Sequence, residues 1–205
     1  MNIAVVGTGN IGGRLARVWA GNGHRIFLGT RNANDEKILA LVSANPTSIT
    51  AHSTADAAQR ADVILLAVPA SVAFNAVREL GNVKGKIIID AMNAVFRKPE
   101  PYNKTSEAII AACGNDHIVK CFNWIGAENM DNPYYGNDVA DMILCGNHSE
   151  DKKIVRQLAE DCGFRVFDIG NIEKEGITEN AAVLWGSLAS GAGLGRNIAF
   201  KILKR

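Results

Sequence analysis

The stretch Gly7-Thr8-Gly9-Asn10-Ile11-Gly12 decides the fold, because it has the form G-x-G-x-x-G and directly follows the short apolar run Asn2 to Val6. A helical pattern, Gly12 to Gly21, begins at its end, and a second apolar run, Arg25 to Gly29, comes next. A strand, glycine turn, helix and second strand within about thirty residues form the unit that binds a dinucleotide in Rossmann-type sheets. We therefore predict that a pyrophosphate binds at the start of this helix, on the residues Gly7, Thr8, Gly9, Asn10 and Ile11.

The rest of the chain alternates short apolar runs with segments of helical period, which indicates a parallel sheet with crossover helices. The later strands are predicted at Val63 to Val68, Lys86 to Asp90, His117 to Phe122, Asp141 to Cys145 and Arg165 to Asp168. The later helices are predicted at Glu36 to Val42, Ala70 to Leu80, Ser106 to Cys113, Glu150 to Cys162, and from Thr178 onward, with a break at Ser190 to Gly193.

This order of elements predicts an α/β fold of the Rossmann type, doubly wound, with a mostly parallel sheet and a short C-terminal helical extension. Residues 1–170 are expected to form the nucleotide-binding domain. Residues 171–205 are expected to form helices that close the substrate cleft or make a dimer contact.

Composition and charge exclude several classes of protein. The chain has 205 residues and a net charge of +1, and its Lys and Arg residues are spread out, so neither a nucleic acid nor a membrane is expected as a partner. No apolar run approaches the roughly 20 residues that span a bilayer, and the N-terminus lacks the basic leader of a signal peptide, so a cytoplasmic location is expected. The four cysteines show no zinc-like spacing, and no metal site is predicted: Cys113, Cys121, Cys145 and Cys162.

The end of the second predicted strand bears on the choice of cofactor. An Asp or Glu there would accept the ribose hydroxyls of NAD, but this chain has Thr30, Arg31 and Asn32. The guanidinium of Arg31 can form two hydrogen bonds with a 2′-phosphate, and Thr30 and Asn32 can donate further ones. The sequence therefore predicts NADP(H) as the cofactor in preference to NAD.

The nicotinamide end should lie beyond the carboxyl ends of the later strands, where ligands bind in open parallel sheets. The next cofactor-binding candidates are Ala67, Val68 and Pro69 after one strand, and Asn93 and Ala94 after another. Asn123 and Trp124 are the candidates for binding the substrate. Asn93 and Asn123 either hydrogen-bond a carboxamide or substrate carbonyl, or close turns of their own backbone.

No apparatus for proton transfer is evident, and the catalytic residues stay unassigned. The four histidines, His24, His52, His117 and His148, have no triad partner in the sequence, and His117 stands at a predicted strand start, the wrong end for catalysis. Alcohol dehydrogenation needs a general acid or base, whereas hydride exchange with a flavin-like ring needs mainly stacking and distance.

The residues resemble the F420:NADP oxidoreductase family over essentially the whole chain. The stretches that carry this resemblance are Gly7 to Gly12, Gly29 to Arg31, Ala67 to Pro69, Asn123 to Met130 and Gly195 to Lys201. The resemblance implies NADPH as cofactor and an 8-hydroxy-5-deazaflavin, coenzyme F420, lying against the nicotinamide in a cleft closed by C-terminal helices. The closing motifs look most like bacterial members whose acceptor is unsettled, and the nucleotide domain is also similar to that of the STEAP ferric reductases.

Two departures from the family pattern concern the acceptor site. The chain has Val6-Gly7-Thr8-Gly9 where the family usually has G-G-T-G, and Trp124 where smaller residues are usual. The phosphate site carries over, but the deazaflavin site does not carry over cleanly. Trp124 occupies part of the acceptor cleft, stacks on a flat acceptor ring, or belongs to the core.

We therefore expect an NADP-dependent oxidoreductase that transfers a hydride between NADP(H) and a small-molecule acceptor, namely a deazaflavin (coenzyme F420) or a flavin. One alternative is an NADPH-binding sensor or regulatory protein without turnover. Another is a reductase of a small carbonyl or imine, although the residues after Gly170 cannot supply the large helical domain of such enzymes.

A homodimer is also expected, because no second domain covers the apolar residues of the C-terminal part. The alternative is that these residues cap the sheet within one chain. They are Val183, Leu184, Trp185, Leu188, Leu194, Ile198, Phe200 and Ile202.

Overall fold

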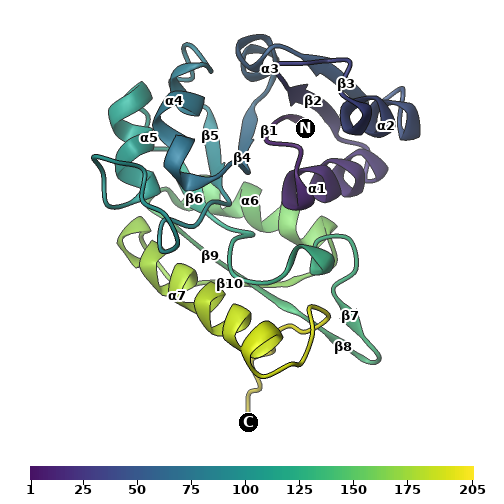
Figure 1. The fold of residues 1–205 in the computed structure, drawn as a ribbon, viewed down its shortest axis with the longest axis vertical. Coiled ribbons are helices and arrows are strands. Elements are labelled where there is room, and N and C mark those ends of the chain that lie inside the picture. Colours follow the sequence, from purple (N-terminus) through teal and green to yellow (C-terminus); the bar gives the residue numbers. More distant parts are fainter.

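A twisted eight-stranded sheet forms the centre of the computed structural model, which describes all 205 residues (Figure 1). The strand order is β10-β9-β6-β5-β4-β1-β2-β3, and every neighbouring pair is parallel except β6 and β9. The Rossmann-type, mostly parallel fold is confirmed. The strands are β1 (Asn2–Val6), β2 (Arg25–Gly29), β3 (Ile49–His52), β4 (Val63–Leu66), β5 (Ile87–Asp90), β6 (Ile118–Lys120), β9 (Asp141–Gly146) and β10 (Arg165–Asp168).

Helices cover both faces of this sheet, because its strands are apolar on both sides. In β1, Ile3 and Val5 face one core while Ala4 and Val6 face the other, as expected when successive side chains point to opposite faces. The first core is covered by α1 (Asn10–Gly21), α2 (Glu36–Ala44) and α6 (Ser149–Asp161). The second is covered by α3 (Thr54–Arg60), α4 (Ala73–Arg78) and α5 (Thr105–Cys113).

Two adjacent elements, β3 and α3, are missing from the sequence prediction. Strand β3 has only four residues, too few to show a clear period. Helix α3 has seven residues, and the one local signal for it is Ser53, whose side chain accepts a hydrogen bond from the Asp56 amide and caps the helix. The small antiparallel pair β7 (Tyr134–Tyr135) and β8 (Asp138–Val139) is also unpredicted.

The C-terminal part departs from the prediction of two helices. Helix α7 (Glu175–Gly186) continues into a single π-helical turn, Ser187–Gly191, and no helix follows. We call residues 192–205 the C-terminal segment. Gly193 and Gly195 have φ values of 70° and 75°, which lie outside the right-handed helical region and end the helix. The segment then passes the start of β9, where the Phe200 carbonyl accepts a hydrogen bond from the Asp141 amide at 3.0 Å.

None of the helices is both long enough and apolar enough to cross a bilayer.

Candidate functional site

The glycine turn between β1 and α1 presents main-chain amides to open space. Gly7 has a φ of 97°, and a Cβ there would collide with the Ala67 carbonyl, while a Cβ at Gly12 would collide with the Gly7 carbonyl. At Gly9, by contrast, a Cβ would meet no heavy atom within 4 Å. Helix α1 also has no acidic residue in its first turn and no side-chain cap. The turn thus leaves its free amides and the positive end of the helix open to an anion.

Two cavities meet at this turn and bring the ends of β1, β2 and β4 together. The first, of about 400 Å³, is lined by Gly7, Thr8, Thr30, Arg31 and Val68, among others. The second, which we call the Arg31 pocket, has a volume of about 300 Å³ and is lined by Thr8, Gly9, Thr30, Arg31, Asn32, Asp35, Lys37 and Ile38. The two cavities share lining residues at this turn, so a dinucleotide that extends from one cavity into the other can lie along it.

Arg31 borders both cavities, and its exposed guanidinium takes part in no ion pair. Its neighbours shape the turn: Thr30 Oγ1 donates to the Asn32 carbonyl and accepts from the Asn32 amide, each at 3.1 Å. Asn32 Oδ1 in turn accepts a hydrogen bond from the Asn34 amide at 3.0 Å. The predicted trio is therefore brought together, with Arg31 as its free cation.

Lys37 is a lining residue that the sequence prediction missed. It lies in the first turn of α2, where its amide donates to Asp35 Oδ1 at 2.9 Å, and it borders the Arg31 pocket without forming an ion pair. The available signal was a cation directly after the acidic residues Asp35 and Glu36, at the predicted start of a helix.

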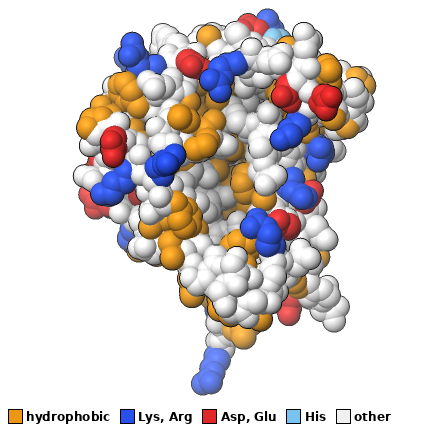
Figure 2. All heavy atoms as spheres, in the orientation of Figure 1, with side chains coloured by type: hydrophobic (Ala, Val, Ile, Leu, Met, Phe, Trp, Pro, Cys, Tyr) orange, Lys and Arg blue, Asp and Glu red, His pale blue; other side chains and the backbone are white.

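A third cavity, here called the cleft, has a volume of about 300 Å³ and lies at the carboxyl ends of β5 and β6. It contains the predicted residues Asn10, Ile11, Asn93, Asn123 and Trp124, together with several residues of α7 and the C-terminal segment. The face of the molecule drawn in Figure 2 is hollowed near its centre, with hydrophobic side chains in the hollow and Lys and Arg side chains around it.

The two asparagines bond to each other across the strand ends and do not close turns of their own. Asn123 Nδ2 donates to Asn93 Oδ1 at 2.9 Å and also lies 3.1 Å from Thr178 Oγ1, and Asn93 Nδ2 donates to the Asn123 carbonyl at 2.7 Å. Asn123 Oδ1 is buried and has no hydrogen-bond partner. An unpaired buried acceptor is costly, so this oxygen suits a ligand that donates a hydrogen bond in the cleft.

The other residues predicted to bind the cofactor, Ala67, Val68, Pro69 and Ala94, do not all lie at the same cavity. Val68 borders the first cavity, while Ala67 lies beneath the glycine turn and donates its amide to the Val6 carbonyl at 2.9 Å. Pro69 is exposed and precedes a short 3-10 helix. Ala94 is buried beside a separate cavity near Lys98 and Lys104, so the structure does not bring it to the cleft.

Trp124 belongs to the core and also borders the cleft. Its side chain is buried, and its ring stacks on Phe200 with centroids 5.3 Å apart and an interplanar angle of 16°. The C-terminal segment therefore helps to hold Trp124, because Phe200 belongs to it. Its indole nitrogen has no hydrogen-bond partner.

The C-terminal segment is fixed to the cleft by a second set of contacts. Arg196 Nε lies 2.7 Å from Glu128 Oε1, and its guanidinium lies over the ring of Trp185, 5.1 Å from the centroid. Trp185 Nε1 donates to the Ile198 carbonyl at 2.8 Å. The hydrogen bond from Arg196 lowers the pKa of Glu128. A non-helical segment thus borders the cleft where helices were predicted.

A buried ionic network lies behind the cleft and was not predicted. Lys120 Nζ is fully buried, 3.1 Å from Asp90 Oδ2 and 2.6 Å from Glu179 Oε1. Glu179 Oε2 also accepts a hydrogen bond from the Val95 amide at 2.9 Å. Burial lowers the pKa of Lys120, but the facing carboxylates outweigh burial, so that its pKa is raised. The network joins β5, β6 and α7, which together form the cleft.

Comparison with known proteins shows one family to which part of the chain is similar. Residues 2–94, which include the glycine turn, the Arg31 pocket and Asn93, match the family model described as NADP oxidoreductase, coenzyme F420-dependent. The N-terminal part of the chain is therefore similar to the members of this family.

Similar proteins extend the family match over the whole chain. The F420-dependent NADP reductase of Methanocaldococcus jannaschii is 29% identical over 201 residues, covering 87% of this chain and 88% of that protein. The solved structure of a proposed F420-dependent NADP reductase from Arthrobacter sp. FB24 is 27% identical, with a TM-score of 0.86 over 100% of both chains. The metalloreductase STEAP3 of Rattus norvegicus is 25% identical over 175 residues, which are 83% of this chain but only 34% of that protein.

Proposed function

We propose that this chain is an NADP-dependent oxidoreductase of that family, which transfers a hydride between NADP(H) and a flat deazaflavin (coenzyme F420) or flavin-like acceptor. The observation that carries the proposal is that one glycine turn borders the first cavity, the Arg31 pocket and the cleft. Thr8 and Gly9 line the Arg31 pocket, and Asn10 and Ile11 line the cleft. The names of the relatives from Methanocaldococcus jannaschii and Arthrobacter support the same pair of reactants.

The residues present fit an NADP dinucleotide. The amides around Gly9 hold the pyrophosphate, in the space that a Cβ at this position would enter. Arg31 and Lys37 hold the 2′-phosphate, and Asn32 Nδ2, which has no partner in the protein, donates a hydrogen bond to it. Asn123 Oδ1 accepts a hydrogen bond from the carboxamide of the nicotinamide or from the acceptor. When bound, the reduced cofactor supplies the hydride.

The lining of the cleft suits a reaction in which two flat rings stack at a short distance from each other. Ile11, Phe96, Trp124 and Trp185 line it, and no histidine, aspartate, glutamate or lysine does. The walls therefore offer apolar and aromatic surfaces on which flat rings can stack, whereas a carbonyl or imine substrate would need a general acid beside it. This composition favours a flavin-like acceptor over a small carbonyl or imine.

The test is the loss of the near-ultraviolet absorbance of NADPH when the purified chain is mixed with 8-hydroxy-5-deazaflavin, with flavin mononucleotide or with a ferric chelate. We expect loss with the deazaflavin or the flavin, and a much slower loss with the Gly9→Val variant. NADPH that binds tightly but is not oxidised with any acceptor would contradict the proposal and would instead support a sensor without turnover.

We further propose a homodimer, in which α7 and the C-terminal segment make the contact. Ile177, Val183 and Leu184 of α7 are exposed, as are Leu194 and Ile202. Of the other apolar residues expected at a dimer contact, Trp185 is buried, and Ile198 and Phe200 pack against the first core within the chain. Sedimentation at micromolar concentration tests the proposal: a dimer is expected, and Leu184→Glu should dissociate it. A monomer would overturn it.

A further inference from the structure

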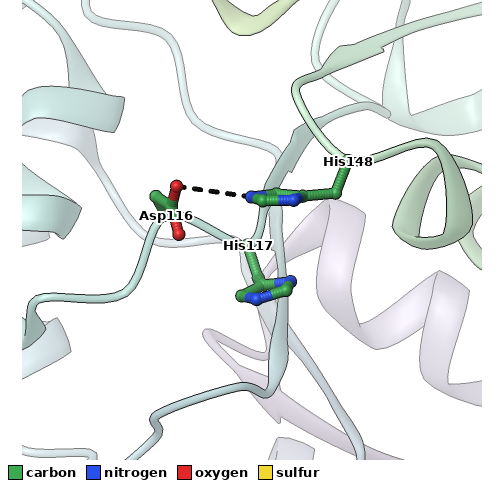
Figure 3. A group of neighbouring side chains, drawn as sticks. All are labelled: Asp116, His117 and His148. Carbon is green, nitrogen blue, oxygen red and sulfur yellow. Dashed lines mark ion pairs between the residues drawn. The ribbon is translucent and has the colours of Figure 1, made fainter.

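Three neighbouring side chains, Asp116, His117 and His148, form a compact cluster (Figure 3). Asp116 and His117 lie in the connection between α5 and β6, and His148 directly precedes α6. Because β6 begins at Ile118 and Asn123 follows its other end, the cluster lies at the edge of the sheet opposite to the cleft. One possible ligand atom from each residue lies within 4.8 Å of the other two.

The separation of His148 and Asp116 matches a shared metal ion. His148 Nε2 lies 3.3 Å from Asp116 Oδ2, is itself buried, and has no hydrogen-bond partner. A ring nitrogen that faces a carboxylate without a hydrogen bond leaves a place for a cation to bind between the two atoms. Two ligand atoms that are each about 2.1 Å from a tetrahedral Zn²⁺ lie about 3.4 Å apart.

His117 has the supporting contact that metal-binding histidines usually have. Its Nδ1 lies 2.9 Å from Asp151 Oδ2, and the side chain of Asp151 is only 10% exposed. This carboxylate holds the proton on Nδ1 and leaves Nε2 with a lone pair for a ligand. A histidine whose other nitrogen binds a carboxylate is both oriented and made more basic.

The two imidazole rings are close enough to share one ion after a small rotation. They stack with centroids 4.2 Å apart and an interplanar angle of 15°, so two protonated rings would repel each other. Closing the largest separation to tetrahedral spacing requires a movement of about 1 to 2 Å. The side chains of His117 and His148 are each 36% exposed and that of Asp116 is 61% exposed, which leaves room for this movement.

We propose that Asp116, His117 and His148 bind a Zn²⁺ ion, with a water molecule as the fourth ligand. Nitrogen and carboxylate oxygen are ligands that zinc prefers. The carboxylates of Asp116 and Asp151 balance the charge of the ion and the partial positive charge at the start of α6. The ion joins the α5–β6 connection to α6 and stabilises the fold without contacting the cleft.

The proposal is tested by calorimetric titration of ZnCl₂ into the full chain after treatment with a chelator. We expect one zinc ion per chain and a rise of several degrees in the unfolding temperature, because a ligand that binds only the folded state stabilises it. His117→Ala and His148→Ala should each weaken zinc binding at least tenfold. His52→Ala and Cys113→Ser are the matched controls and should bind zinc as the wild type does, because both residues lie outside the cluster.

A second measurement keeps the test valid if a variant folds poorly. In the wild-type chain, the imidazole NMR signals of His117 and His148 should shift during the zinc titration, while those of His24 and His52 should not. The proposal is overturned if zinc does not bind with saturation, if the His117→Ala/His148→Ala double variant binds zinc as the wild type does, or if the signals of His24 shift instead. Oxidation of NADPH should not depend on zinc, so this test is independent of the proposed function.

Discussion

Asn123 Nδ2 lies 2.9 Å from Asn93 Oδ1, and this hydrogen bond joins the residues that follow β5 and β6 at the floor of the cleft. It also fixes the orientation of the Asn123 carboxamide, whose Oδ1 is left buried and unpaired. The polar pair thus leaves one acceptor free for a ligand in an otherwise mostly apolar and aromatic cavity.

Replacement of Asn123 by alanine should slow hydride transfer without unfolding the protein. A single hydrogen bond contributes about 0.5–1.5 kcal/mol, so kcat/KM for NADPH oxidation should fall roughly two- to tenfold. Steady-state kinetics measures the change. Asn180→Ala, at an exposed position on α7, is the matched control and should change nothing. Equal rates for Asn123→Ala and the wild type would show that the carboxamide contacts neither reactant.

Alanine at Gly7 should destabilise the fold, whereas alanine at Gly9 should weaken the binding of NADPH and leave the fold stable. Gly9→Ala meets no protein atom within 4 Å, so the free energy of unfolding should stay within about 0.5 kcal/mol of the wild type while NADPH binding weakens at least tenfold. Gly7→Ala adds a Cβ against the Ala67 carbonyl at a φ of 97°, so it should destabilise the fold by more than about 2 kcal/mol. Urea unfolding and fluorescence titration with NADPH separate the two effects. Normal binding by Gly9→Ala would argue against a pyrophosphate at this turn.

Lys120→Met should be strongly destabilising. The substitution leaves the buried carboxylates of Asp90 and Glu179 without their cation, and breaking a buried pair in this way costs about 3–5 kcal/mol. Urea unfolding should therefore shift to much lower denaturant. The double variant Lys120→Met/Glu179→Gln should recover part of this loss, because it removes one of the uncompensated charges. If the double variant is no more stable than Lys120→Met, charge is not the cause.

The contact between Glu128 and Arg196 predicts a dependence on pH. The hydrogen bond from Arg196 lowers the pKa of Glu128 below its ordinary value of 4.5. Its contribution to stability is therefore fully present above pH 4.5 and is lost as the pH falls through the lower folded pKa. Arg196 is 57% exposed, so the effect should be less than about 1 kcal/mol.

Amide hydrogen exchange in the C-terminal segment measures this effect. In the wild type, exchange at the Leu194 and Gly195 amides, which donate to the Leu188 and Ala189 carbonyls, should accelerate below pH 4.5 relative to exchange in Glu128→Gln, after correction for the intrinsic rate. Glu128→Gln should show no such transition, because its side chain does not titrate. Identical profiles for the two proteins would mean that the ion pair does not hold the segment.

Local patterns predicted the fold of the first part of the chain, from β1 to β2, because its features lie close together in sequence. The glycine turn follows β1 directly, and Arg31 follows β2 within two residues, so both could be recognised without knowing the fold. The bond between Asn93 and Asn123 depends on which strands are neighbours, and the sequence could only place each residue at a strand end. Lys120 lies in a predicted apolar strand, and its buried ion pair could not be predicted because its partner Glu179 lies 59 residues away in the sequence.

The C-terminal segment was wrongly predicted as helical because of the pattern of its apolar residues. In the structure some of these residues are partly buried by contacts with distant parts of the chain. Ile198 and Phe200 pack against the first core, and their carbonyls accept hydrogen bonds from Trp185 and Asp141. These tertiary contacts outweigh local helical propensity. The cluster of Asp116, His117 and His148 was also missed, because it depends on contacts between distant parts of the chain. The antiparallel pairing of β6 with β9 brings Asp116 and His117 close to His148.

The central claim is that Arg31 selects the phosphorylated dinucleotide, and parallel titrations with NADPH and NADH test it most directly. Arg25→Ala is the matched control, because Arg25 is exposed at the other end of the same strand. The wild type and Arg25→Ala should both prefer NADPH. Arg31→Ala should raise the Kd for NADPH about 10- to 100-fold, since hydrogen bonds to charged groups contribute about 1.5–3 kcal/mol, and should leave the Kd for NADH within about twofold. Equal binding of both dinucleotides by the wild type, or an equal loss of both in Arg31→Ala, would contradict the account.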